Sequence, residues 1–207
     1  MKKGSCYIIG AGECSRLLLQ LKDEDYVIAV DGGYEYAKDY RIDLVVGDFD
    51  SLGYVPDHPN VIKLMPEKDD TDMLVAIKEG LEAGYKTVHI YGGCGGRMDH
   101  TIANIQHLAY LAERDARGYL YGSESVMTVI SNGSMSFPAD AAGYVSVFAY
   151  GNEAKGVDLS GLKYSLKNAT LDHSYPLGVS NEFIGEEVCV SVREGKLLIV
   201  FPDSVHA

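Results

Sequence analysis

The chain has 207 residues, 46% of them hydrophobic, so it is long enough to form one large or two small domains with a buried core. Its 30 acidic and 18 basic residues give a formal charge of −12, which argues against nucleic acid as a partner because a polyanionic backbone would be repelled. No apolar run approaches the roughly 18 residues of a membrane span, and the N-terminus lacks a signal-length apolar region. We therefore expect a cytoplasmic protein with no membrane partner. Its four cysteines show no C-x-x-C spacing, which favours reduced thiols over a zinc site or disulfides.

The first part of the chain alternates short apolar runs with helical patterns. The strands that we predict there cover 6–9, 27–30, 44–46, 61–64, 87–91 and 118–121. The helices predicted between them cover 15–21, 34–39, 71–83 and 99–113. Such an alternation indicates an α/β fold, with a mostly parallel sheet covered by helices.

After residue 122 the pattern changes, because strand candidates follow one another without helices. They cover 126–130, 135–137, 144–149, 154–159, 187–193 and 196–201. Turn signals such as Ser131-Asn132-Gly133 separate them. We therefore predict two domains: an α/β domain over 1–122, and a smaller antiparallel all-β domain, resembling a β-sandwich, over 123–207.

Two carboxylates two residues apart, Asp48 and Asp50, directly follow the predicted strand 44–46. In open parallel sheets, ligands bind beyond the carboxyl ends of the strands. If the backbone stays extended through Phe49, both carboxylates project to one side and the ring points back into apolar packing. Carboxylates so placed repel each other unless a cation lies between them, and their hard oxygens suit Mg²⁺. The alternative is an acidic turn in which Asp50 caps backbone amides.

A second acidic cluster, EKDDTD at 67–72, follows the predicted strand 61–64. Thr71 has the chemistry of a helix N-cap and would place Asp72 in the first turn, where the helix dipole favours an anion. Capping alone could explain this cluster. Its position at the same sheet edge as Asp48 and Asp50 favours a metal site.

The segment YGGCGGRMDH at 91–100 contains a strand end, four glycines, an arginine and a helix start. Glycines let backbone amides approach a phosphate, the helix N-terminus adds positive potential, and Arg97 offers a forked donor. These features predict a phosphate-binding loop. The alternative is a flexible turn with Asp99 as N-cap. We interpret His100 as a helix-start or packing residue, and Cys94 has no evident base partner that would make it a nucleophile.

A competing pattern lies at the N-terminus, where GAGECS at 10–15 follows a strand and Asp31 follows the next strand. This arrangement imitates a dinucleotide-binding fingerprint. It is incomplete, because Ser15 replaces the third glycine and Asp31 leads into two further glycines. No G-x-x-x-x-G-K-[ST] sequence occurs, which excludes a P-loop kinase.

Taken together, these motifs resemble those of the thiamine pyrophosphokinase family, in the same order along the chain. They are DGG at 31–33, GDFDS at 47–51, KDDTD at 68–72, GGCGGRMDH at 92–100 with Asn104, GLKYSL at 161–166 and GVSNE at 178–182. Each motif is weak by itself, but the set covers nearly the whole sequence.

The resemblance implies an ATP-dependent diphosphotransferase that moves the diphosphoryl group of ATP to the hydroxyl of thiamine. The products would be AMP and thiamine diphosphate, and the cofactor Mg²⁺. It also implies a homodimer with its active sites at the interface. The domain 1–122 would bind nucleotide and metal, and the domain 123–207 would bind thiamine.

The resemblance also implies roles for individual residues. The metal-binding carboxylates would be Asp48, Asp50 and Asp72, and with Arg97 and Asp99 they would form the catalytic group. The residues implied in ATP binding are Lys68, Asp69, Thr71, Gly93, Gly96, Arg97 and Asn104. Thiamine would meet Ser180 and Asn181. Asp70 fills a variable place and receives no role.

The chemistry of the residues fits this reaction, since attack on a triphosphate needs masked charge and an aligned hydroxyl rather than a covalent residue. Thiamine is a cation, for which Tyr164 or Phe183 could supply a stacking ring, unless both are ordinary core aromatics. Two other classes stay open: a metal-dependent glycosyltransferase that uses a nucleotide sugar, and a non-catalytic nucleotide-binding module. The second acidic cluster and the pair Ser180 and Asn181 count against both.

Overall fold

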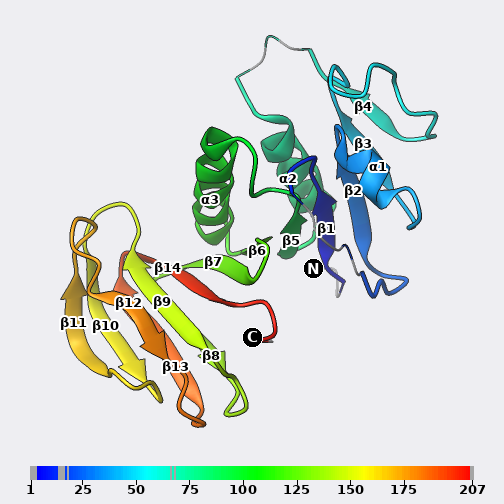
Figure 1. Cartoon of the computed structure of the whole chain (residues 1–207). Helices are drawn as coiled ribbons and strands as arrows, with labels where there is room; N and C mark the ends of the chain where they lie inside the picture. The colour runs from blue at the N-terminus through cyan, green and yellow to red at the C-terminus, as the bar shows by residue number, and fades with distance from the viewer. Residues whose placement is uncertain (1–3, 14–16, 18, 66, 68, 206–207) are drawn as a thin grey trace. The chain divides into compact units, whose positions relative to one another are not determined.

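The computed structural model describes residues 4–13, 17, 19–65, 67 and 69–205, and these form two compact units. Within the described residues, the first unit extends to His107 and includes Asp115–Ser123. The second unit comprises Leu108–Arg114 and the residues from Glu124 onward. The helices and strands of both units are labelled in Figure 1. The functional domain limits expected from the sequence, 1–122 and 123–207, stay a prediction.

The first unit is built on a parallel sheet, as the sequence predicts. Its strands are β1 (Cys6–Ile9), β2 (Tyr26–Val30), β3 (Leu44–Gly47), β4 (Val61–Lys63), β5 (Thr87–Tyr91) and β6 (Arg117–Tyr121). They lie in the order β6-β5-β1-β2-β3-β4, and every neighbouring pair is parallel. The inner strands are rich in fully buried aliphatic residues such as Ile8, Ile28 and Val45, because helices and loops cover both faces of the sheet.

Three helices accompany this sheet: α1 (Gly33–Ala37), α2 (Asp72–Glu82) and α3 (Met98–Ala112). The predicted start of α2 is confirmed, since the Thr71 hydroxyl accepts a hydrogen bond from the Leu74 amide at 3.2 Å. This cap fixes Asp72 as the first residue of the helix. The cap and the sheet together therefore decide where the Asp72 carboxylate lies.

The helix predicted over 15–21 is wrong in its described part, and its remaining positions lie outside the described residues. Leu17, Leu19 and Leu21 are not helical and are partly buried against the core beside β1 and β2. The Tyr40 hydroxyl donates to the Leu17 carbonyl at 2.7 Å and receives the Leu19 amide at 3.5 Å. Burial of alternate leucines in a non-helical segment thus outweighs the helical propensity of leucine.

The second unit is antiparallel, which confirms the predicted all-β part. Its strands are β7 (Ser125–Ser131), β8 (Ser134–Phe137), β9 (Tyr144–Ala149), β10 (Ala154–Ser160), β11 (Leu166–Leu171), β12 (Gly178–Glu182), β13 (Val188–Glu194) and β14 (Lys196–Pro202). They pair in two runs, β12-β9-β14-β7 and β11-β10-β13-β8. The rings of Phe137 on β8 and Phe201 on β14 meet edge to face with centroids 5.0 Å apart, so the two runs share a core.

Two strands of this unit, β11 and β12, are absent from the sequence prediction. Each ends its run, and each contains exposed polar residues in place of an apolar alternation. Each also contains a residue in the left-handed region, Asn168 with φ 49° and Ser180 with φ 56°, and its pairing register is shifted. These irregular edge strands carry little of the burial pattern from which strands are predicted.

Within the described residues, no helix is long and apolar enough to cross a membrane. The cytoplasmic location expected from the sequence stays a prediction. Cys6, Cys94 and Cys189 are free thiols, as expected, and Cys14 lies outside the described residues.

Candidate active site

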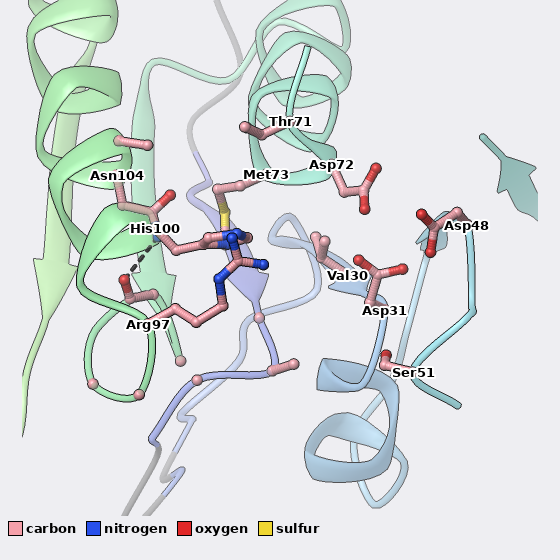
Figure 2. Close-up of a pocket in the computed structure, with 18 of the residues that line it drawn as sticks. Val30, Asp31, Asp48, Ser51, Thr71, Asp72, Met73, Arg97, His100 and Asn104 are labelled. Carbon is pink, nitrogen blue, oxygen red and sulfur yellow. Dashed lines mark hydrogen bonds between the residues drawn. The ribbon is translucent and has the colours of Figure 1, made fainter. Parts of the chain in front are cut away.

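A cleft of about 470 Å³ lies in the first unit, at the edge where its parallel strands end (Figure 2). Each wall follows the carboxyl end of a strand. The walls are 10–12 after β1, Val30 and Asp31 at the end of β2, Asp48, Asp50 and Ser51 after β3, Thr71–Met73 at the start of α2, and residues between 92 and 104 from the β5–α3 loop and α3. This is the sheet edge at which open α/β folds bind ligands.

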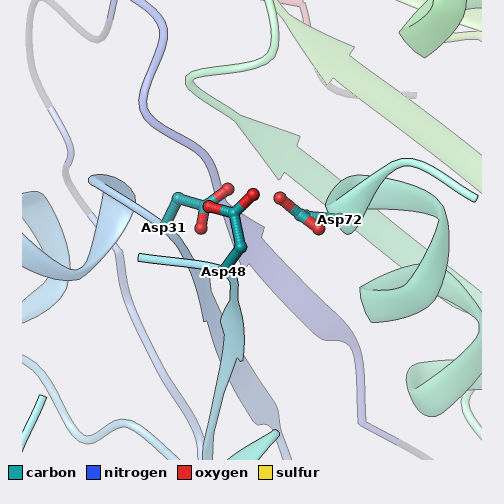
Figure 3. Close-up of side chains that lie close together, drawn as sticks. All are labelled: Asp31, Asp48 and Asp72. Atoms are coloured by element: carbon teal, nitrogen blue, oxygen red, sulfur yellow. The ribbon is translucent and has the colours of Figure 1, made fainter. Parts of the chain in front are cut away.

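Three carboxylates converge in this cleft from three elements of the chain. Asp31 follows β2, Asp48 follows β3 and Asp72 begins α2. One oxygen of each lies within 4.8 Å of the others, and Figure 3 shows the three side chains directed toward one another. All three residues are partly buried. Clustered carboxylate oxygens are hard ligands, so this cluster fits Mg²⁺ or a similar divalent cation.

The surroundings of Asp31 show how strongly these charges interact. Burial, followed by the hydrogen bond and the charge of Asp72, raises the pKa of Asp31 from 3.8 to about 7. The Phe49 amide, which donates to Asp31 Oδ1 at 3.3 Å, acts in the opposite direction. Without a cation the cluster therefore tends to retain a proton.

The extended backbone that the sequence analysis assumed at Phe49 is wrong. Phe49 has φ 63°, and its ring is only 3% exposed, so the chain turns sharply while the ring stays in the core. Asp48 Oδ1 accepts the amide of Asp50 at 3.1 Å within this turn. Asp50 lines the same cleft but lies outside the cluster of Asp31, Asp48 and Asp72. Its expected role as a metal ligand stays a prediction.

Two glycine-containing loops touch each other at the base of the cleft. The amide of Gly10 donates to the Tyr91 carbonyl and the amide of Gly12 to the Gly92 carbonyl, both at 2.8 Å. A Cβ atom on Gly92 would lie 2.2 Å from the Gly10 carbonyl oxygen. Close backbone contact thus accounts for the glycines of the N-terminal pattern that imitates a dinucleotide fingerprint.

The second loop turns into α3 through three glycines with positive φ, Gly92, Gly95 and Gly96. Arg97 follows, and its guanidinium extends into the cleft (Figure 2). It donates to Asp99 through Nη2 at 2.6 Å and Nε at 3.2 Å. Because this ion pair is exposed, it contributes little stability and leaves the guanidinium able to exchange its partner for a phosphate.

The residues expected to bind ATP are distributed unevenly around the cleft. Those that line it are Thr71, Gly93, Gly96, Arg97 and Asn104. Asp69 is exposed, and neither Asp69 nor Asp99 is among the lining residues. Lys68 lies outside the described residues. Asp70, which received no role, pairs with Lys78 on α2 at 2.5 Å.

Asn181 in the second unit has an unexpected structural role. Its Oδ1 accepts the Tyr164 amide at 3.0 Å and its Nδ2 donates to the Tyr164 carbonyl at 2.7 Å. The side chain is 3% exposed and also receives the Glu182 amide. These bonds hold Tyr164 beside β12, where Tyr164 and Asn181 help to line a hollow of about 230 Å³. No sequence motif indicates this pair of hydrogen bonds, because both partner atoms on Tyr164 belong to the backbone.

The other residues considered for thiamine lie near β12 as well. Ser180 is exposed, and its amide donates to Ser146 Oγ at 3.0 Å. Tyr164 is 62% exposed, whereas Phe183 is 7% exposed and packs edge to face on Phe137 at 5.3 Å. Phe183 is therefore a core aromatic, and of the two rings Tyr164 is the one accessible to a ligand.

Asp31 is the member of the carboxylate cluster that the sequence analysis did not consider as a ligand. In the sequence, Asp31 belongs to the DGG motif at 31–33 and is the acidic residue of the incomplete dinucleotide-binding fingerprint. Its position directly after a predicted strand was the available signal, since β2 lies between β1 and β3 in the sheet. Strand ends that neighbour each other place their following residues together.

Comparisons with known proteins agree on one family. Residues 17–120 match the model described as thiamin pyrophosphokinase, catalytic domain, and residues 135–197 match thiamin pyrophosphokinase, vitamin B1 binding domain. Thiamine pyrophosphokinase of Bacillus subtilis (strain 168) is 28% identical over 162 residues, which cover 74% of this chain and 75% of the relative.

Solved structures show the same fold. The crystal structure of thiamine pyrophosphokinase from Bacillus subtilis has a TM-score of 0.84 at 24% identity, with coverage of 96% of this chain and 98% of that one. Thiamin pyrophosphokinase from Geobacillus thermodenitrificans has a TM-score of 0.81 at 27% identity, with coverage of 96% and 97%. The likeness therefore extends over both units.

Mg²⁺ should stabilise the parent protein through Asp48, because this carboxylate belongs to the converging cluster. In the absence of metal we expect Asp48→Asn to be as stable as the parent or more so, since it removes one like charge while an amide oxygen can still accept the Asp50 amide. Added Mg²⁺ should raise Tm of the parent by roughly 2–4 °C for each kcal/mol of binding free energy, and should raise that of Asp48→Asn much less. Thermal denaturation with and without MgCl₂ measures both effects.

The exposed Asp57 provides a charge-matched control. Asp57→Asn should respond to Mg²⁺ as the parent does. An Asp48→Asn variant that keeps the full Mg²⁺ response would show that this cluster is not the divalent cation site.

Proposed function

The chain belongs to the thiamine pyrophosphokinase family and is a diphosphotransferase, and we propose that it transfers the diphosphoryl group of ATP to the hydroxyl of thiamine, giving AMP and thiamine diphosphate. The observation that carries the reaction is one cleft with three converging carboxylates facing a glycine loop and an arginine. The glycosyltransferase and the binding-module alternatives are set aside, because both halves of the chain match models of a single kind of diphosphotransferase.

We propose Mg²⁺ as the cofactor, held by Asp48 and Asp72 together with Asp31, and with Asp50 at the rim of the same cleft. Carboxylate oxygens from separate elements suit a hard divalent cation. Burial, and after it the hydrogen bond and the charge of Asp72, raises the pKa of Asp31, and a cation would offset both the burial of these charges and their repulsion. When bound, Mg²⁺ supplies positive charge that masks a triphosphate.

The protein's own contribution is positioning. Arg97 would exchange Asp99 for a phosphate oxygen, and the left-handed glycines of the loop bring backbone close to the phosphates. The oxygen of the thiamine hydroxyl would bond to the β-phosphorus in line and lose its proton to water, while the bond from that phosphorus to the α–β bridging oxygen breaks and AMP leaves. Asp99 would act by keeping the Arg97 guanidinium at the cleft until a phosphate replaces it as the partner. The other residues proposed for ATP are Lys68, Asp69, Thr71, Gly93, Gly96 and Asn104.

We place thiamine binding in the second unit, at the hollow beside β12. Ser180 lies on that strand, and Asn181 holds the exposed Tyr164 at its border. An accessible tyrosine ring attracts a cation such as thiamine. In this proposal Asn181 shapes the hollow through its two hydrogen bonds to the Tyr164 backbone.

We also propose a homodimer with active sites at its interface. β12 is the edge strand of its run. Large apolar side chains are exposed on β12, on the neighbouring strand β9 and in the residues next to β12 in the sequence. They are Tyr144, Tyr175, Leu177, Val179 and Ile184. An edge strand bordered by exposed apolar residues is a surface that proteins ordinarily cover.

Incubation with ATP, Mg²⁺ and thiamine tests the function. We expect AMP and thiamine diphosphate to appear in equal amounts, and phosphorus NMR separates them from ADP and thiamine monophosphate. Formation of ADP in step with thiamine consumption would contradict diphosphoryl transfer.

The Asn181→Ala variant tests the thiamine site. Loss of both Tyr164 bonds should release the border of the hollow and lower kcat/KM for thiamine by roughly ten- to a hundredfold, mostly through KM, with KM for ATP changed much less. Asn181→Asp keeps an acceptor for the Tyr164 amide but sets a carboxylate oxygen against the Tyr164 carbonyl, so it should impair thiamine binding at least as much as Asn181→Ala. Equal weakening of ATP and thiamine binding would remove this residue from the thiamine site.

Sedimentation velocity tests the dimer. We expect the parent to sediment as two chains and Ile184→Lys to shift toward one chain, because a charge on the exposed patch would be buried in the contact. Val55→Lys changes an exposed aliphatic residue in the first unit and should remain dimeric. A parent protein with the mass of one chain would contradict the proposal.

A further inference from the structure

Four successive carbonyl groups, at the end of β5 and in the loop that follows it, all accept hydrogen bonds from donors of the protein. The carbonyls of Tyr91, Gly92 and Cys94 receive the amides of Gly10, Gly12 and Glu13 at 2.8, 2.8 and 3.0 Å. The Gly93 carbonyl receives the side-chain amide of Asn104, from Nδ2, at 2.7 Å. Three of these bonds come from backbone amides, whereas the bond at Gly93 comes from a side chain.

The direction of these carbonyls matters for an anionic ligand. Carbonyl oxygens carry partial negative charge and repel phosphate, whereas the amide groups of the same peptides attract it. Three of the carbonyls are bonded to the N-terminal loop by amides between residues 10 and 13. The fourth is bonded to α3 by the Asn104 side chain, whose bond is dashed in Figure 2. While these four bonds persist, the four carbonyl oxygens are occupied by donors of the protein.

The bond at Gly93 depends on which way the Asn104 amide is turned. An asparagine amide rotated by half a turn would place Oδ1 against the Gly93 carbonyl, and two acceptors would face each other. His107, one turn further along α3, lies with Nδ1 3.2 Å from Asn104 Oδ1. The Gly93 carbonyl can only accept, so it favours the orientation in which Nδ2 faces it, and a proton on His107 Nδ1 adds a second bond, to Oδ1, that favours the same orientation.

His107 acts at a distance from the ligand. Its side chain is not among those that line the cleft, and the exposed fractions of Asn104 and His107 are 5% and 7%. Burial lowers the pKa of His107, against the influence of Asp70, which favours the neutral ring with a single N–H to donate. The loop packs closely here, since a Cβ on Gly93 would lie 2.7 Å from Leu120 Cδ1 and 3.1 Å from Asn104 Nδ2.

We propose that His107 is a positioning residue for ATP, which holds Asn104 in the orientation that turns the Gly93 carbonyl away from the phosphates. The proposal rests on the proposed function, in which the triphosphate binds at the glycine loop. It assigns His107 no contact with either substrate. Its loss should therefore affect ATP and leave thiamine largely unaffected.

Steady-state kinetics of three variants tests this role in the full-length enzyme. His107→Leu removes the donor and keeps apolar volume, and should raise KM for ATP by roughly five- to twentyfold with KM for thiamine within about twofold of the parent. His107→Asn places an amide nitrogen near the position of Nδ1 and should restore KM for ATP to nearly the parent value. The neighbouring exposed Gln106 supplies a matched control, since Gln106→Leu should leave both constants unchanged.

A double-mutant cycle shows whether His107 acts through Asn104. Asn104→Asp replaces the donor to Gly93 by an acceptor and should raise KM for ATP at least as much as His107→Leu. Adding His107→Leu to Asn104→Asp should then change KM for ATP by less than about twofold, because the bond that His107 orients is already lost. Fully multiplicative effects would overturn the proposal.

A further variant distinguishes a folding defect caused by the loss of His107 from the loss of its positioning role. If His107→Leu does not fold, His107→Gln replaces it in the test. The amide nitrogen of Gln lies one bond further from the backbone than His Nδ1, so it should not reach Asn104 Oδ1 in the same way. His107→Gln should therefore raise KM for ATP, whereas His107→Asn should not. Equal KM values for His107→Asn and His107→Gln, or an equal rise in both substrates' KM, would overturn the inference. A parent enzyme that forms no thiamine diphosphate would instead contradict the proposed function.

Discussion

Electrostatic repulsion among Asp31, Asp48 and Asp72 is the constraint to which the functional edge of the first unit is adapted. Packing of the parallel strands brings the ends of β2 and β3 together, and the Thr71 cap brings Asp72 to the same place. The fold therefore sustains three acidic groups that would separate if they were free. Such pre-organised charge weakens the metal-free protein and strengthens cation binding, because a cation converts the repulsion into attraction.

Many elements of this fold could be predicted from the sequence because local signals agree with tertiary structure. Apolar runs bounded by turns place β1 and β5 to the residue, and Thr71 marks the start of α2. The segment around Leu19 was mistaken for a helix because three leucines in a row favour that state locally. Its final conformation is set by burial and by Tyr40, more than twenty residues away, which no local pattern reveals.

The candidate site likewise has features that could be predicted from the sequence and features that could not. The rule that ligands bind beyond strand ends led from the sequence to Asp48 and Asp72, and the structure places both in one cleft. To predict that Asp31 belongs to the cluster, one needs to know the order of the strands in the sheet, which cannot be read from the sequence. The turn at Phe49 depends on a buried ring and on Asp31 as acceptor, and the two hydrogen bonds of Asn181 depend on the backbone of Tyr164. These features arise from contacts between distant segments and have no short motif.

The backbone contact between the two glycine-containing loops has a consequence for how the cleft can evolve. Because Gly10 and Gly92 meet without an intervening side chain, no substitution there can be accommodated by repacking a neighbour. The base of the cleft is thus closed to gradual change of shape. Diversification among ligands must come from exposed positions at its border, such as Ala11 between the two close contacts, or from the start of α3. A constrained base beneath an adaptable border would allow proteins with little sequence in common to keep the same shape at the base of the cleft.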